Sequence, residues 1–397
     1  MGFATYADVL RIPVVRRIIL LGLVVRVPLW ASEMAITLHV VTHLHGSYAD
    51  AGLIAAFGGA ALGISGPWRG RRLDQLGVRR AIAPSILVLL VTWSIAPWVG
   101  YWPLLVCNTI AGLFTVPTFS IIRAVVIGAV REDQRATALS IDSVATEITF
   151  MIGPVLGVLA ATTLPTPLAL FICAMTQLVG SVLMWTANPP LQHKTAVGEQ
   201  AGSRLRLNLP ILAVFAMSIA AIIILTGEDM SVVAAMRGWG RPGAIGWVLG
   251  LWGAGSAVGG IVYGGLKKRP SAAALLLLLG LSTALIAVAD RQWSYILLLT
   301  LSGAFCAPAM TAMTEALSRL VPAANRGEAM GWHGSAMMLG SAVGSPLIGV
   351  ALDRGGWTAG VLLAGITGSV VAVIGVVTTA RARVPEDAES EAVLEAV

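Results

Sequence analysis

The sequence predicts an all-α membrane protein with twelve transmembrane helices, arranged as two pseudo-symmetric six-helix bundles. Hydrophobic residues make up 57% of the 397 positions and charged residues only 12%, whereas a soluble domain carries about 25% charged residues. The apolar stretches run for about 20 residues without the alternation of a barrel strand, which favours helices. The two halves of the chain also share a set of motifs in the same order.

Apolar runs long enough to cross the hydrocarbon core of a bilayer occur twelve times along the chain. The polar stretch 188–208, a predicted cytoplasmic linker, divides them into an N-terminal bundle over 1–187 and a C-terminal bundle over 209–380. The segment 381–397 is acidic, and we expect a short disordered cytoplasmic tail there. The predicted spans cover approximately 18–40, 49–68, 81–99, 103–125, 138–160, 166–187, 209–227, 243–266, 271–289, 294–318, 328–351 and 357–380.

Positive charge is distributed unevenly between the two sides of the predicted membrane. Most of the 26 Lys and Arg residues fall in loops on the same side as the N-terminus, and such an excess marks the cytoplasmic side. We therefore expect a multi-pass protein of the cell membrane with both termini in the cytoplasm. This distribution also explains the net charge of +6 without nucleic-acid binding, which requires basic residues on one face of a soluble domain.

The two predicted bundles repeat three features in the same order. Each bundle has a proline in its fourth span, an arginine before its fifth span, and glycines around a proline within the fifth span. The separations are 191, 191 and 192 residues for Pro117 and Pro308, Arg135 and Arg326, and Gly157 and Gly349. Three matches at nearly one separation indicate an internal duplication. Transporters are often built from such repeats, with the substrate site near the membrane midplane at the repeat interface.

The loop between the second and third spans combines glycines, an acid and basic residues, in the order Gly70, Asp74, Gly77, Arg79 and Arg80. This pattern resembles the cytoplasmic signature of the major facilitator superfamily, and the resemblance covers nearly the whole chain. It implies that family's twelve-helix fold, in which this loop latches the two bundles when the outside is open. Glycine permits a tight turn, and an aspartate can cap a helix or pair with a base. Gln75 replaces the family's basic residue, which leaves one latch contact without its usual partner.

The fifth span contains Gly153, Pro154 and Gly157, which resemble the antiporter motif of the same family, with Thr149 in place of its first glycine. Proline bends a helix, and small residues let helices approach closely. In the family this pattern is associated with exporters more than with importers, which favours export. Generic helix packing is the alternative, and the recurrence of the pattern over 340–349 supports that alternative.

Ionisable residues within spans are the best markers of a transport site, because burying a charge in lipid without a partner is costly. Arg26 and Glu33 lie seven residues apart in the first span, on nearly the same face and about 10 Å apart along the axis. Trp30 lies between them. We expect Glu33 to exchange protons and substrate, while Arg26 positions it or binds an anionic group. A fixed structural pair of Arg26 and Glu33 is the alternative.

Three further residues are candidates for the substrate and proton site: Asn108, Glu147 and His333. Glu147 falls near the middle of the fifth span. His333 lies about two turns into the eleventh, where a hydrogen-bonded structural role is the alternative. Many proton-coupled exporters of the family carry an arginine at the position of Asn108, and an amide cannot shift the pKa of a neighbouring acid through charge.

The remaining ionisable residues of interest lie nearer the ends of the predicted spans. Asp142 and Arg123 are close to the inner ends of the fifth and fourth spans, where a structural ion pair is as reasonable as a transport role. Glu228, Asp229 and Glu315 lie close enough to span ends that we expect them to be solvated.

The resemblance implies a secondary active transporter that exports a drug-like or amphipathic small organic molecule with protons, by alternating access. Transport of a sugar or another polar solute is the alternative, because the tryptophans in the spans suit apolar ligands and sugar rings alike. A membrane enzyme should show clustered carboxylates or histidines at one membrane face, and a sensor a sizeable soluble domain; the sequence shows neither. No cofactor or metal is expected, because nucleotide-binding and metal-binding motifs are missing. The expected partners are the substrate, protons and the lipid bilayer, with the chain acting as a monomer.

Overall fold

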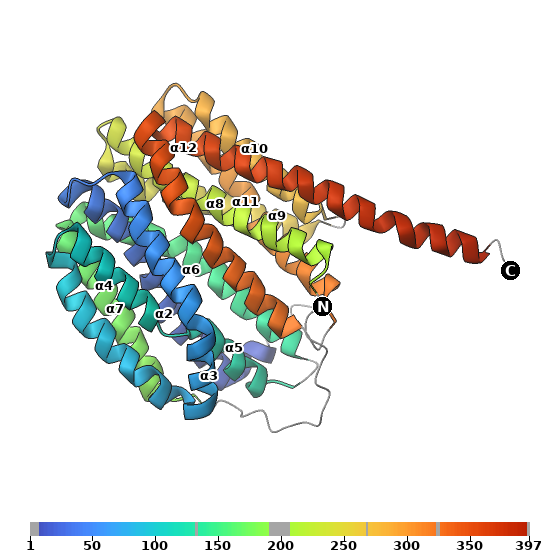
Figure 1. The fold of residues 1–397 in the computed structure, drawn as a ribbon, viewed down its shortest axis with the longest axis horizontal. Helices are drawn as coiled ribbons and strands as arrows, with labels where there is room; N and C mark the ends of the chain where they lie inside the picture. Colours follow the sequence, from blue (N-terminus) through green and yellow to red (C-terminus); the bar gives the residue numbers. More distant parts are fainter. Residues whose placement is uncertain (1–7, 132–133, 190–206, 267–268, 323–325, 395–397) are drawn as a thin grey trace. The chain divides into compact units, whose positions relative to one another are not determined.

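The computed structural model describes residues 8–131, 134–189, 207–266, 269–322 and 326–394, and these residues contain helices but no strand (Figure 1). The chain divides into two compact units. The first comprises Met1–Glu199 and Arg241–Gly250, and the second comprises Gln200–Gly240 and Leu251–Val397. The all-helical fold class predicted from the sequence is confirmed.

Within the described ranges, nine helical segments are long and apolar enough to cross a membrane. One of them, Trp332–Val376, is 45 residues long and is interrupted at Gly355 and Gly356, so it accounts for two spans. The 26-residue helix α2 and the shorter apolar segment Ala272–Val288 account for two more. The described helices are therefore consistent with twelve spans.

Helix α2 is the central helix of the first unit, because it contacts α5, α6 and α7. Helix α3 contains two predicted spans, which separate at Gly77, whose φ of 73° lies in the left-handed region that glycine tolerates. The unit consists of α2 (Pro13–Leu38) with a short π-helical continuation (His39–His43), α3 (Tyr48–Ile95), α4 (Tyr101–Phe114), α5 (Thr118–Ala129), α6 (Arg135–Thr163) and α7 (Thr166–Ala187).

The predicted fourth span, 103–125, is not the single helix that we expected. It is divided into α4 and α5 by Thr115, Val116 and Pro117. Proline lacks an N–H group and disfavours the helical conformation in the preceding residue, and both preceding residues here are β-branched. The repeat-related Pro308 lies inside α11 without a break, where the two preceding residues are not β-branched.

Helix α8 is the central helix of the second unit and contacts α10, α11 and α12. It extends to Gly238, past the predicted end at 227, so that Glu228 lies inside the helix. Helix α12 continues to Leu394, where we expected a disordered tail; alanine and glutamate, frequent in this tail, favour helix. The unit consists of α8 (Leu209–Gly238), α9 (Ile245–Gly265) from Leu251 onward, α10 (Ala272–Leu285), α11 (Gln292–Leu320) and α12 (Arg326–Leu394).

Corresponding glycines bring one pair of helices close together in each unit. A Cβ atom added at Gly153 of α6 would lie 2.5 Å from the Cβ of Trp30 on α2. One added at the repeat-related Gly344 of α12 would lie 3.1 Å from the Cγ1 of Ile223 on α8. A Cβ atom does not fit at such distances without displacing a neighbour, because protein interiors are close-packed. The internal repeat in the sequence is thus matched by equivalent packing inside the two units.

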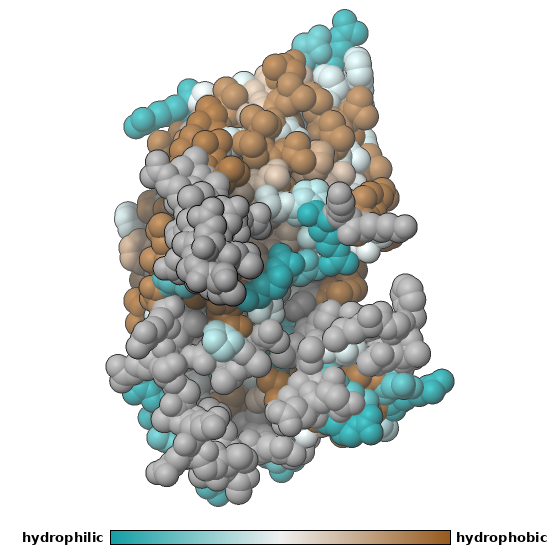
Figure 2. Space-filling model, turned by 90° about the vertical axis from the view of Figure 1, so that its right-hand side faces the viewer, coloured by the Kyte–Doolittle hydropathy of each residue, from teal (hydrophilic) through white to brown (hydrophobic). Residues whose placement is uncertain are grey.

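Many large hydrophobic side chains are exposed on the helices. Ile64 and Ile261, for example, are each 77% exposed. Figure 2 shows hydrophobic side chains, coloured brown, over the upper part of the face in view. Soluble monomers rarely expose large contiguous apolar patches. The surface therefore agrees with helices that lie in lipid.

Candidate functional site

Helix α2 passes through two separate apolar clusters of the first unit. Its N-terminal part, with Ile18 and Ile19, belongs to one cluster, and its C-terminal part, with Ala31 and Ala35, belongs to the other. Arg26 lies on α2 between these clusters and is only 2% exposed. A guanidinium in such a place needs a partner, because an isolated buried charge is costly.

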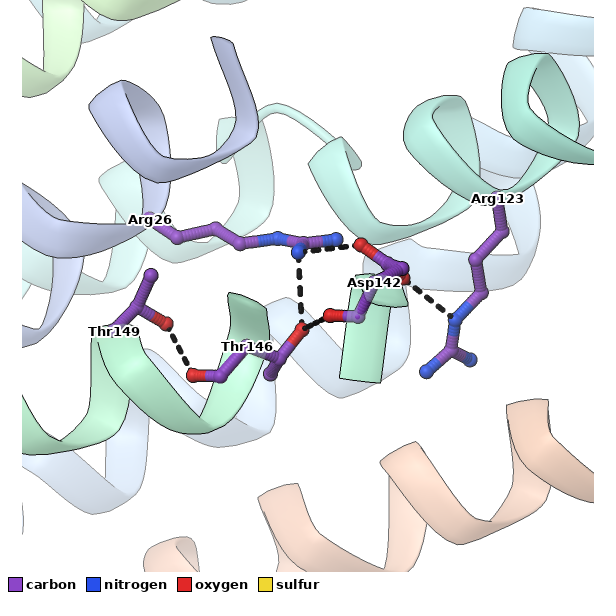
Figure 3. Close-up of polar contacts among 5 residues, drawn as sticks. All are labelled: Arg26, Arg123, Asp142, Thr146 and Thr149. Carbon is purple, nitrogen blue, oxygen red and sulfur yellow. Dashed lines mark hydrogen bonds and ion pairs between the residues drawn. The ribbon is translucent and has the colours of Figure 1, made fainter. Parts of the chain in front are cut away.

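Asp142 on α6 is the partner of Arg26 (Figure 3). The Arg26 Nη1 atom donates to Asp142 Oδ1 at 2.8 Å and to Thr146 Oγ1 at 3.0 Å. Arg123 on α5 lies on the other side of Asp142, with its Nε atom 3.5 Å from Oδ2. The Asp142 side chain is 1% exposed and that of Arg123 is 33% exposed. A fully buried carboxylate therefore stands between one buried and one partly exposed guanidinium, and we call these three residues the Arg26 cluster.

Two donors of the Arg26 guanidinium have no acceptor within the Arg26 cluster. The Nε and Nη2 atoms of Arg26 are buried without a hydrogen-bond partner among the described residues. The hydroxyl of Thr146 donates to the Asp142 carbonyl oxygen at 2.8 Å, so it can accept the bond from Arg26. The ring of Phe119 lies 4.3 Å from the guanidinium carbon of Arg26, a favourable cation–π distance. Arg26 thus keeps donors that an anionic group could use.

Glu33 does not pair with Arg26, so the alternative of a fixed pair between them is wrong. Its side chain is exposed, and its carboxylate makes no hydrogen bond or ion pair within the part of the chain that the structure describes. Trp30, between the two, packs its ring 4.3 Å from that of Phe150 on α6. The first span therefore carries one charge that is fixed by α6 and one that has no fixed partner.

The glycine motif of α6 lets α6 pack closely against α2. A Cβ atom added at Gly157 would overlap the carbonyl oxygen of Ala31 on α2, and Pro154 lies inside the helix between the two glycines of the motif. Gly157 is about four turns from Asp142 along α6, at 3.6 residues per turn. Close packing at this end therefore holds α6 against the same helix that carries Arg26.

Asn108 of the first unit is not brought into the Arg26 cluster. Asn108 donates through Nδ2 to the carbonyl oxygen of Ile54 at 2.9 Å, so it fastens α4 to α3. His333 belongs to the second unit, where it is 7% exposed on α12. The repeat separation of 191 residues places His333 at the position of Asp142. The side chain of Glu147 lies outside the described part of the structure.

The predicted latch loop is held against α7 by one of its arginines. Arg79 donates from Nε and Nη2 to two carbonyl oxygens in the last turn of α7, both at 3.2 Å. Arg80 is exposed, and Gly70 lies within α3. The side chain of Asp74 is outside the residues described, so the latch itself stays a prediction.

Arg69, directly before this loop, was not singled out by the sequence. It is 5% exposed, donates from Nη1 to the Leu113 carbonyl oxygen at 3.0 Å, and donates from Nη2 to Ser85. The last carbonyls of a helix lack partners within that helix, and Arg69 supplies one near the end of α4. Burial lowers the pKa of Arg69 to about 10, so its guanidinium stays charged at neutral pH.

The second unit contains a buried carboxylate that we expected to be solvated. Glu228 is 1% exposed, and its oxygens contact side chains of α9, α10 and α11. The expectation was wrong because it ended the span at 227, whereas the apolar run resumes directly after Asp229 and α8 continues to Gly238. That resumption was the signal that could have revealed Glu228. Of the other two acids, Asp229 is half-buried, and Glu315 is 28% exposed and ion-paired.

The sequence matches the family described as Major Facilitator Superfamily over residues 18–240 and 217–395. A search among curated proteins found no match. Among solved structures, a variant of the nucleoside transporter NupG is 15% identical with a TM-score of 0.71, covering 92% of this chain and 99% of that chain.

Two further solved structures have the same fold. A bacterial homolog of the human lysosomal transporter Spinster is 12% identical with a TM-score of 0.68, covering 91% of this chain and 95% of that one. The human organic anion transporter MFSD10 is 14% identical with a TM-score of 0.61, covering 92% and 99%. These likenesses show the fold alone, but the family match spans nearly the whole chain. The chain therefore belongs to the Major Facilitator Superfamily, as a membrane transporter and not an enzyme.

Proposed function

We propose that this transporter exports an amphipathic small organic molecule in exchange for protons, by alternating access. Membership of the family already implies a small-molecule substrate. The observation that carries the finer proposal is the separation of two charges on α2. Arg26 is engaged by Asp142, which leaves the Glu33 carboxylate in the same span without a fixed partner.

An unpaired carboxylate in a membrane span can bind a proton or a substrate group in turn. Because Arg26 is held by α6, it does not compete for Glu33, and a proton or a cationic or polar group of the substrate can do so. Ionisable residues in spans commonly mark such pathways, since burial there is costly without a functional gain. The exchange at Glu33 would link each substrate movement to a proton movement in the opposite direction.

The surroundings of this stretch of α2 suit a molecule with both charged and apolar parts. Arg26 retains two unbonded donors for an anionic group. Three aromatic rings lie along the same stretch, those of Trp30, Phe119 and Phe150, and such rings offer large apolar contact areas. An amphipathic molecule would use both the charges and the rings.

Several finer features belong to the same proposal. Both termini lie in the cytoplasm, and the chain works as a monomer in the cell membrane. The linker 188–208 joins bundles over 1–187 and 209–380. The loop with Asp74 acts as the latch of the outward-open state, and the basic residues of the loops and the family signature support this orientation.

Transport by purified protein in proteoliposomes with an imposed pH gradient tests the proposal. The panel should include cationic, anionic and neutral amphipathic compounds, a nucleoside and a sugar, with substrate flux and proton flux recorded together. We expect an amphipathic compound to move against the proton flow. Movement of the sugar or nucleoside alone would favour the polar-solute alternative.

Glu33→Gln identifies the coupling residue. We expect this variant to fold normally and to exchange labelled for unlabelled substrate, but to lose accumulation driven by the pH gradient. Asp290→Asn is the matched control, because Asp290 is a carboxylate that is 76% exposed outside the spans. A stable Glu33→Gln protein that still couples substrate to proton flux would remove Glu33 from the mechanism.

A further inference from the structure

Glu228 lies where four helices of the second unit meet. It is on α8, and its carboxylate contacts Trp252 of α9, Thr283 of α10 and Ser302 of α11. The residue is 1% exposed, and no Lys, Arg or His side chain pairs with it among the residues described. A buried carboxylate without a cation is unusual, because buried charges are normally paired.

Three oxygen atoms form a closed triangle at this site. The Thr283 hydroxyl lies 2.6 Å from Glu228 Oε1, the Ser302 hydroxyl also contacts Oε1, and the two hydroxyl oxygens are 2.9 Å apart. The other carboxylate oxygen, Oε2, accepts a hydrogen bond from Trp252 Nε1 at 2.8 Å. All three sides of the triangle are therefore hydrogen-bond contacts.

The number of available hydrogen atoms favours a protonated Glu228 in this triangle. Each hydroxyl carries one hydrogen, so Thr283 and Ser302 together supply two hydrogens for three contacts. If Glu228 is ionised, one pair of oxygens faces each other without a hydrogen. A proton on Oε1 supplies the third hydrogen and closes a ring, in which Glu228 donates to Thr283, Thr283 to Ser302, and Ser302 back to Oε1. Such rings strengthen each bond through mutual polarisation.

Nearby hydroxyls add to the shortage of hydrogens. The Thr283 oxygen is also 2.8 Å from the Leu279 carbonyl oxygen. Ser282 is 3.2 Å from Ser302 and 2.9 Å from the same Leu279 oxygen, and its one hydrogen can serve only one of them. Every additional contact competes for the same hydrogens, which makes a proton on the carboxyl group more favourable.

We propose that Glu228 is a second proton-binding site of this transporter, with the ring of Thr283 and Ser302 closed around its protonated form. When water reaches this site, the proton on Oε1 passes to water, the O–H bond of the acid breaks, and both hydroxyls then donate to the resulting carboxylate. The use of this proton in transport rests on the proton coupling proposed above. The binding of the proton itself is supported by the geometry of the ring alone.

The charges around Glu228 leave it free to change protonation state. Asp229 directly follows Glu228 in α8. Tyr295 of α11 interacts electrostatically with both acids. The Tyr295 hydroxyl is buried without a hydrogen-bond partner among the described residues. On α9, α10 and α12, no described charged group acts on Glu228. Without a cation to hold the anion, the balance depends on the hydroxyl ring.

Infrared difference spectroscopy of the purified transporter tests the site without any transport assay. In the Glu33→Gln background, the C=O stretching band of a protonated carboxylic acid should be present at neutral pH, be lost when Glu228→Gln is added, and disappear as the pH is raised. Glu315→Gln is the matched control, because Glu315 belongs to the same unit but pairs with Arg269 and Arg319; it should leave the band intact. If Glu228→Gln does not fold, Ser302→Ala should change the frequency of the band by opening the ring.

Three spectroscopic results would overturn the proposal. The first is that the band is missing at neutral pH, and the second is that it persists at every pH at which the protein stays folded. The third is that sodium removes the band at constant pH, which would mean that the site binds this cation instead of a proton. Transport adds a separate test. Glu228→Gln should retain substrate exchange, while its proton-driven accumulation of substrate should fall at least tenfold. Full accumulation in a folded variant would refute the role of Glu228 in coupling. If the wild-type protein moves no protons, the proposed function fails, while the titration of the band still decides the site.

Discussion

Replacing Asp142 by asparagine should destabilise the first unit more than any other single change in the Arg26 cluster. The change leaves the guanidiniums of Arg26 and Arg123 next to each other without a carboxylate between them. Removal of one partner from a buried ion pair costs about 3–5 kcal/mol. Because Arg26 is 2% exposed and two cations lose their partner at once, we expect the free energy of unfolding to fall by about 5 kcal/mol.

The other two members of the cluster set an order that the measurement must reproduce. Arg26→Met should cost less, about 3 kcal/mol, because Asp142 keeps Arg123 at 3.5 Å. Arg123→Met should cost about 1 kcal/mol or less, since its side chain is 33% exposed and solvent weakens such pairs. The predicted order of destabilisation is therefore Asp142, Arg26, Arg123.

Equilibrium unfolding of the purified variants in mixed detergent micelles measures these free energies. The double variant Arg26→Met with Asp142→Leu is the decisive comparison, because replacing a buried pair by apolar groups is often nearly neutral. It should recover most of the stability that Asp142→Asn loses. A double variant as unstable as Asp142→Asn, or a larger effect at Arg123 than at Arg26, would refute the reasoning.

Three other predictions follow from the packing, the loop motif and the charge distribution. Gly157→Ala should lower the thermal stability, because its Cβ overlaps a carbonyl oxygen of α2, whereas Gly66→Ala meets nothing within 4 Å and should not; equal effects would contradict the packing argument. Asp74→Asn should slow transport at unchanged stability, since a latch biases a conformational equilibrium, and normal turnover would remove the latch. Single cysteines introduced at Thr195 and Gln292 should react with a membrane-impermeant reagent only from the cytoplasmic and the outer side, respectively; labelling from one side would overturn the orientation.

The fold could be predicted because its signals are local in the sequence. Each long apolar run identifies a span by itself, without information about its neighbours. The fixed repeat separation is found by comparing two segments of the sequence directly. The break at Thr115, Val116 and Pro117 was missed because hydropathy does not register backbone conformation. These three residues are apolar enough to continue a span, but a proline after two β-branched residues does not continue a helix.

The partners of the buried charges could not be predicted in the same way. The seven-residue spacing of Arg26 and Glu33 places them on one face of a helix, but it says nothing about which neighbouring helix supplies a carboxylate. Asp142 is more than a hundred residues away in the sequence, and only the packing of α6 on α2 brings it within 2.8 Å. Glu228 was misjudged for a different reason, because the predicted length of α8 was too short.

The break in the fourth span has a mechanical consequence for the first unit. Its first part, α4, is fastened to α3 near its middle, through Asn108 bound to the Ile54 carbonyl, and at its C-terminal end, through Arg69 bound to the Leu113 carbonyl. Its second part, α5, packs instead against α2, where Gly22 accommodates Ile122. The two halves of one span are thus attached to different helices, with a joint at Thr115, Val116 and Pro117 between them. If α2 moves with its bound solute, this joint allows α5 and Arg123 to follow while α3 and α4 stay still.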